Sequence, residues 1–168
     1  MEDSVEDQNQ KINGLIVKLD SLEIRSRKSQ LENLSLIINW SDSTDKRIRN
    51  IFKSISFNSG KQIVQFKELR NDLTAINSLD SMIPNRLIIL KSQLIDLRTD
   101  INNDIGSNSQ NDTNILVESL NISQIEGLIN LRDSGYRRIM TNFNELQSNL
   151  DSSLNVILIN EYSLVCDQ

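Results

Sequence analysis

The feature that most constrains this chain is the scarcity of residues that interrupt a helix: one proline and five glycines occur among 168 residues. Elsewhere Leu and Ile recur at spacings of three and four, as in long amphipathic helices that lie side by side. Aromatic residues make up only 4% of the chain, so the core must consist mainly of Leu, Ile and Val. The pattern predicts an all-α fold, an elongated helical bundle or coiled coil of four to five helices with a long C-terminal helix.

The polar clusters between the apolar stripes predict where helices begin and end. An N-terminal helical segment over 1–105 should contain helices at about 5–39, 45–57, 61–79 and 84–105. A kink or restart is expected near 25–29, where serines interrupt the stripe. The capping residues Ser41–Asp45 predict the first boundary, and Pro84 suits a first helical turn. Residues 106–114 have no apolar side chain and should form a flexible loop before a long helix over 115–168, which packs back on the first segment.

Two apolar stripes, one in the fourth predicted helix and one in the last, are the best candidates for contact with another protein. They are most simply packed against each other, but further aliphatic residues flank them: Ile88, Ile89 and Ile95 on one helix, and Ile129 and Val156 on the other. A helix that is apolar on more than one face must bury the surplus, so we predict burial by a partner, with a self-contained bundle as the alternative. The predicted partner-binding residues are Leu87, Leu90, Leu94, Leu97, Ile101, Ile139, Phe143, Leu146, Leu150 and Leu154.

Residues suited to catalysis or metal binding are scarce. The chain has no histidine, one cysteine and no glycine-rich loop. Without histidine, the ordinary base for a serine or cysteine nucleophile is missing, and the carboxylates form no evident acid–base pair. Asp100, Asn102 and Asp104 alternate like the start of a calcium loop, but Ile105 replaces its glycine and Asn111 its glutamate. We therefore expect the protein not to be an enzyme, and to have no catalytic or metal-binding residue, no cofactor and no small-molecule ligand.

The charge of the chain bears on its partners. A formal net charge of −5 argues against a general affinity for nucleic acid. Positive charge gathers on the predicted helix at 45–57, at Lys46, Arg47, Arg49 and Lys53. Such a face is usually solvated, yet it offers a contact for an acidic protein, so a free-standing adaptor is the alternative to an assembly subunit. Contact through apolar stripes should survive high salt, whereas contact through the basic helix should weaken.

The location of the protein is predicted from its termini and its aliphatic runs. The N-terminus is acidic where a secretory signal would be basic and then apolar. The longest aliphatic runs, Leu87–Leu90 and Val156–Ile159, are too short to span a bilayer. We expect an intracellular protein without a transmembrane segment, in the cytoplasm or on the cytoskeleton, with the nucleus or kinetochore as the alternative.

Three stretches of the chain occur in a recognisable order: the Leu-rich Leu15–Leu22, the short basic Asp45–Lys53 and the aliphatic Leu154–Cys166. This order of parts resembles the smallest subunit of the shoulder of dynactin. The chain departs from that family at Glu23–Arg25, where an aromatic-glycine end is expected, and near Tyr162, where the family has a tryptophan. The same stripes are also similar to small coiled-coil subunits of fungal kinetochore or vesicle-tethering complexes. The resemblance implies a non-enzymatic scaffold subunit of a cytoskeleton- or motor-linked assembly, whose partners are other helical subunits.

Overall fold

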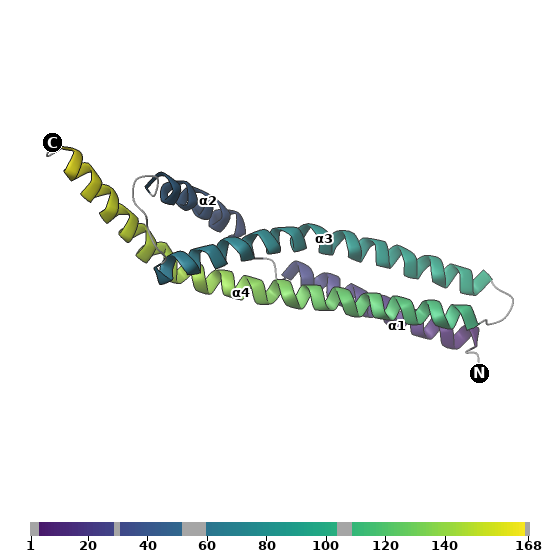
Figure 1. Ribbon diagram of the computed structural model, residues 1–168. Coiled ribbons are helices and arrows are strands. Elements are labelled where there is room, and N and C mark those ends of the chain that lie inside the picture. The colour runs from purple at the N-terminus through teal and green to yellow at the C-terminus, as the bar shows by residue number, and fades with distance from the viewer. Residues whose placement is uncertain (1–3, 29–30, 52–59, 104–108, 167–168) are drawn as a thin grey trace. The chain divides into compact units, whose positions relative to one another are not determined.

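The computed structural model describes residues 4–28, 31–51, 60–103 and 109–166, with side chains to Leu154 except that of Ile51. Every regular element in these ranges is an α-helix (Figure 1). The helices are α1 (Val5–Lys28), α2 (Leu34–Ile51), α3 (Lys61–Asn103) and α4 (Ser109–Cys166). The all-α class is therefore confirmed, with four helices in the described ranges and a C-terminal helix of 58 residues.

The helices form two units of three helical segments each. Unit 1 comprises residues 1–30 and 78–133, and therefore α1, the second part of α3 and the first part of α4. Unit 2 comprises residues 31–77 and 134–168, and therefore α2, the first part of α3 and the last part of α4. Within unit 1, α1 runs in the same direction as α4 and opposite to α3 (Figure 1).

In unit 1 each helix turns one apolar stripe toward the other two. The buried stripe residues are Ile12, Leu19 and Leu22 on α1, Leu79, Ile83, Leu87, Leu90, Leu94, Leu97 and Ile101 on α3, and Ile115, Ile122, Ile125 and Ile129 on α4. Four of them, Ile12, Leu97, Ile101 and Ile115, form one cluster toward the N-terminus of α1. Burying each such side chain stabilises the folded state by about 1.5–3 kcal/mol. The three packed stripes are therefore the main source of stability in unit 1.

Unit 2 is centred on Trp40 of α2, the single tryptophan of the chain. Its ring packs edge-on against Phe66 of α3 and Phe143 of α4, at centroid distances of 5.9 and 5.3 Å. Its indole N–H donates to the Oδ2 of Asp151, at 3.3 Å. Because aromatic pairs favour this edge-to-face geometry, Trp40 ties the three segments of unit 2 together, and its fluorescence reports on this unit.

The predicted boundary at Ser41–Asp45 is wrong, because α2 runs through it from Leu34 to Ile51. Ser41 and Thr44 are buried, at 0% and 1% exposure. The Nη1 of Arg70 on α3 donates to the Oγ of Ser41 at 3.0 Å, and Asp45 pairs with Arg49 at 2.9 Å. These polar side chains are thus used in contacts within unit 2, whereas in isolation the same residue types favour helix caps.

The predicted break before Pro84 is also wrong, since α3 continues from Lys61 to Asn103. A proline inside a helix removes one backbone hydrogen bond and costs about 3 kcal/mol. Here Pro84 lies on the exposed face, while Ile83 and Leu87 on either side are buried at 0% and 5% exposure. Burial of the stripe on both sides therefore outweighs the cost of the proline.

Two further boundaries differ from the prediction. The helix expected over 5–39 is divided into α1, which ends at Lys28, and α2, which begins at Leu34, so the restart falls just after the weak part of the stripe. The loop expected over 106–114 is helical from Ser109 onward, and residues 104–108 lie outside the described ranges. Asn111 is buried, and Asp112 accepts a hydrogen bond from Gln8 of α1 at 3.0 Å, so polar residues contact α1 here.

Candidate protein-binding surface

The ten stripe residues predicted to meet a partner are buried by the chain itself. None of them is more than 7% exposed. Leu87–Ile101 lies in unit 1 and Ile139–Leu154 lies in unit 2, so each stripe packs with the other segments of its own unit. These residues form the internal core, and the surface that is available to another protein must be sought among exposed side chains.

Exposed aliphatic side chains are concentrated on unit 1. Of the eleven large hydrophobic side chains that are exposed in the described ranges, nine belong to this unit. They are Val17 and Ile24 on α1, Ile88, Ile89 and Ile95 on α3, and Leu116, Val117, Leu120 and Leu131 on α4. The sequence pattern indicated the three isoleucines of α3 as surplus aliphatic residues, but not Leu116, Val117, Leu120 and Leu131 of α4. A second stripe of α4 at Val117, Leu120 and Leu131 would have revealed them, since its spacings also fit one helix face.

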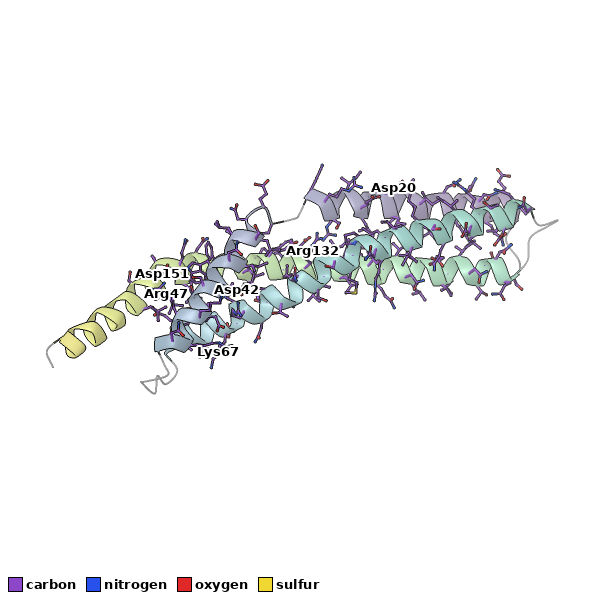
Figure 2. The ribbon with its side chains drawn as sticks, turned by 90° about the horizontal axis from the view of Figure 1, so that it is seen from above. Asp20, Asp42, Arg47, Lys67, Arg132 and Asp151 are labelled. Carbon is purple, nitrogen blue, oxygen red and sulfur yellow. The ribbon has the colours of Figure 1, made fainter. Side chains whose placement is uncertain are left out.

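The basic helix has less free charge than its sequence suggests. The Nη1 of Arg47 lies 2.8 Å from the Oδ1 of Asp151 in α4 (Figure 2). Arg49 pairs with Asp45 one turn earlier, and Lys46 is exposed. Lys53 lies outside the described ranges. Two of the three described cations thus have carboxylate partners within the chain, and a contact with an acidic protein stays a prediction.

In unit 1 the groove between α1 and α3 is bridged by polar side chains. The bridges join Asn9 to Asn102 at 2.6 Å, Asn13 to Arg98 at 3.2 Å, and Asp20 to Lys91 at 3.0 Å. The hydrogen bond from Lys91 to Asp20 raises the pKa of Lys91. From one bridge to the next, the residue number rises along α1 and falls along α3. The bridges therefore fix the antiparallel register of the two helices.

The groove between α1 and α4 is bridged by pairs of opposite charge. Lys18 lies 3.5 Å from Glu126, and Arg25 lies 3.3 Å from Asp133. The two cations are seven residues apart on α1, and so are the two carboxylates on α4. Such a repeat places like charges on one edge of a helix and fixes the parallel register. A hollow of about 460 Å³ lies further toward the N-termini, beside Gly14 and Leu116.

Between α3 and α4 in unit 1, Asp80 pairs with Arg132 at 3.6 Å, but the part of the groove nearer the C-terminus of α3, which we call the open groove, has no such bridge among the described residues. It consists of two hollows of about 270 and 140 Å³. The larger is lined by Asp96, Leu97, Asp100, Val117 and Glu118, and the smaller by Arg86, Ile89, Leu90 and Ile125. Among the described residues, no hydrogen bond or ion pair joins α3 to α4 across these linings. The carboxylates of Asp96, Asp100 and Glu118 in this groove have no cationic partner among the described residues.

Glu118 is the most perturbed group in the open groove. It occupies a position of the buried stripe of α4, between Ile115 and Ile122, and its Oε2 is buried without a hydrogen-bond partner. Burial raises the pKa of Glu118 above its ordinary value of 4.5, while a hydrogen bond with Asn121 opposes this effect. An ionised carboxylate at this position therefore weakens the unit at neutral pH.

Replacement of Glu118 by Gln is expected to stabilise the protein near neutral pH. The folded state holds the Glu118 proton more tightly than the unfolded chain does, so ionisation costs stability as the pH rises above 4.5. The advantage of the variant should therefore disappear at about pH 4. Urea denaturation followed by circular dichroism at both pH values measures it, with the exposed Glu68→Gln as control. An equal gain at both pH values would contradict the assignment of Glu118 as a strained carboxylate.

A buried polar layer closes unit 1 at the end of α1. Arg132 of α4 is only 1% exposed. Its Nη1 donates to the Oγ of Ser26 at 3.1 Å and its Nη2 to the carbonyl oxygen of Ser26 at 2.9 Å. Carboxylate oxygens of Asp80 and Asp133 lie 3.6 and 3.5 Å from the guanidinium. Because carbonyl groups in the last turn of a helix lack partners inside it, Arg132 caps the C-terminal end of α1.

The described ranges also bear on metal binding and on membrane insertion. No group of three or more His, Cys, Asp or Glu side chains among the described residues is placed to hold a metal ion. The described helices include no stretch that is long and apolar enough to cross a membrane. Comparison with protein-family models, with curated proteins and with solved structures gives no match. The surface of unit 1 thus combines exposed aliphatic side chains with carboxylates in the open groove that have no cationic partner among the described residues.

Proposed function

We propose that this chain is a non-enzymatic helical scaffold subunit of a larger assembly, which it joins through the exposed aliphatic side chains of unit 1. The observation that supports the proposal is their concentration on one unit, where nine of the eleven are found. Leu116, Leu120 and Leu131 of α4 are each more than half exposed. Soluble monomers rarely expose many large aliphatic side chains close together, and such surfaces commonly mark protein–protein contacts.

The mechanism in this proposal is geometric. Within unit 1, the packed segments of α1, α3 and α4 keep whatever binds along them at fixed spacings. The partners are other helical subunits, and the resemblance described above points first to a cytoskeleton- or motor-linked assembly in the cytoplasm. A kinetochore or vesicle-tethering complex is the alternative. Both readings assign the chain a structural role without catalysis.

Assembly in the cell of origin tests the proposal. The variant Leu116→Gln, Leu120→Gln, Leu131→Gln should fold normally, because these side chains are exposed and Gln is a good helix former. On size-exclusion chromatography, the tagged wild-type chain should elute in a high-mass fraction. We expect the tagged variant to elute at lower mass. Leu36→Gln with Val64→Gln, two exposed positions of unit 2, is the control. Elution of the wild-type chain as a monomer would refute the proposal. Elution of the triple variant in the high-mass fraction would refute it as well.

A further inference from the structure

We infer that the open groove of unit 1 binds a basic amphipathic helix of a partner protein. This inference rests on the proposed function and adds the chemistry of the partner. The groove has an apolar floor, with Leu97 and Leu90 buried at 7% and 4% exposure, and an exposed apolar rim at Ile89 and Val117. A helix that places leucines at spacings of three and four would fit such a groove by the packing that the three helices of unit 1 already use.

The charge of the groove selects the partner. Asp96, Asp100 and Glu118 line the larger hollow, and none of them has a cationic partner among the described residues. Arg86 stands at the far end, in the smaller hollow. A partner helix with lysines or arginines over the carboxylates would supply the missing counter-charges, and the position of Arg86 favours an acidic or neutral residue at its other end.

The other two grooves of unit 1 lack this property. Between α1 and α4, Lys18 and Arg25 already neutralise Glu126 and Asp133. Between α1 and α3, Lys91 pairs with Asp20. A helix entering either groove would have to break these bridges, whereas entry into the open groove would break none in the described ranges.

A second copy of the chain is a poor occupant of the open groove. Residues 109–133 of α4 carry four carboxylates and a single cation, Arg132, which is buried. In a two-fold dimer the same surface meets itself, so the three carboxylates of Asp96, Asp100 and Glu118 in one copy would find only Arg86 as a cation in the groove of the other. Like charges across an interface disfavour that pairing, and the groove therefore suits a different, basic chain.

Synthetic peptides test the inference directly. The probe is a helical peptide of about 21 residues, long enough to cover the groove, with leucines at spacings of three and four and lysines on both flanks. Its isomer carries glutamates in place of the lysines. Fluorescence anisotropy at low salt should show the lysine peptide binding at least about tenfold tighter, and about 0.5 M salt should shrink the difference. Equal affinities of the two peptides would overturn the inference.

Variants locate the binding site. Asp96→Asn with Asp100→Asn should weaken binding of the lysine peptide about tenfold, because both carboxylates are exposed in the groove. The matched control, Glu32→Gln with Glu68→Gln, removes the same charge at exposed positions of unit 2 and should leave binding unchanged. Equal weakening by both pairs would show attraction to the net charge of the chain, and the groove would not be the site.

Cross-linking separates failure of this inference from failure of the proposed function. A photoreactive residue is placed at Val117, in the groove, or at Val17, on the exposed face of α1, and the chain is irradiated in the cell of origin. We expect a discrete cross-linked partner at Val117 that the Asp96→Asn, Asp100→Asn variant loses. A partner seen only at Val17 would refute the groove while keeping the assembly role. Cross-links at neither position, with the chain monomeric, would refute both.

Discussion

Replacement of Leu94 by aspartate is expected to unfold unit 1. Leu94 lies in the middle of the α3 stripe and is completely buried. A carboxylate placed there without a partner costs several kcal/mol, which is comparable with the whole stability of a small domain. The helical circular dichroism signal should fall sharply at room temperature, and the midpoint of any remaining urea transition should drop well below that of the wild-type chain.

The same helix provides the control for this prediction. Ile88 is 67% exposed, so Ile88→Asp should change stability by less than about 0.5 kcal/mol although it introduces the same charge. In unit 2, Leu146→Asp at 0% exposure should shift the fluorescence of Trp40. If Leu94→Asp and Ile88→Asp had similar effects, the assignment of the buried face of α3 would be wrong.

The sequence predicted the helices and their buried stripes well, because both depend on local spacing. All ten stripe residues named from the pattern are buried. Helix boundaries were predicted less well, since they depend on tertiary contacts. Ser41 bonds Arg70, a residue 29 positions away, and Pro84 is accommodated by burial of its neighbours in unit 1. Neither contact can be seen in a window of a few residues, so each polar cluster was interpreted as a helix end.

The candidate surface was harder to predict, because it is defined by what the other helices leave uncovered. Asp96 and Asp100 look like Asp20 in the sequence, but only Asp20 meets a cation on a neighbouring helix. Arg132 was missed for the opposite reason, since a charged residue is usually assigned to the surface. Its spacing of three from Ile129 and four from Tyr136 placed it on the buried stripe of α4, and this was the signal that could have identified it.

Arg132→Ala is expected to destabilise the protein by about 3 kcal/mol or more. The change removes two hydrogen bonds to Ser26, one of which caps α1, and takes away the guanidinium beside Asp80. Arg137→Ala, at an exposed position of the same helix, should change the free energy of unfolding by less than about 0.5 kcal/mol. Urea denaturation of both variants measures the difference, and equal stabilities would show that the buried layer contributes little.

A double-mutant cycle with Asp80 separates the charge pair from the cap. In the wild-type chain, Asp80→Ala should be destabilising, because it removes a carboxylate that compensates a guanidinium only 1% exposed. In the Arg132→Ala background the same change should be neutral or stabilising, since Asp80 then lacks that cation. The expected coupling energy is about 1–3 kcal/mol. Additive effects would mean that Arg132 acts through Ser26 alone, as a helix cap, and that the carboxylate of Asp80 is screened by solvent.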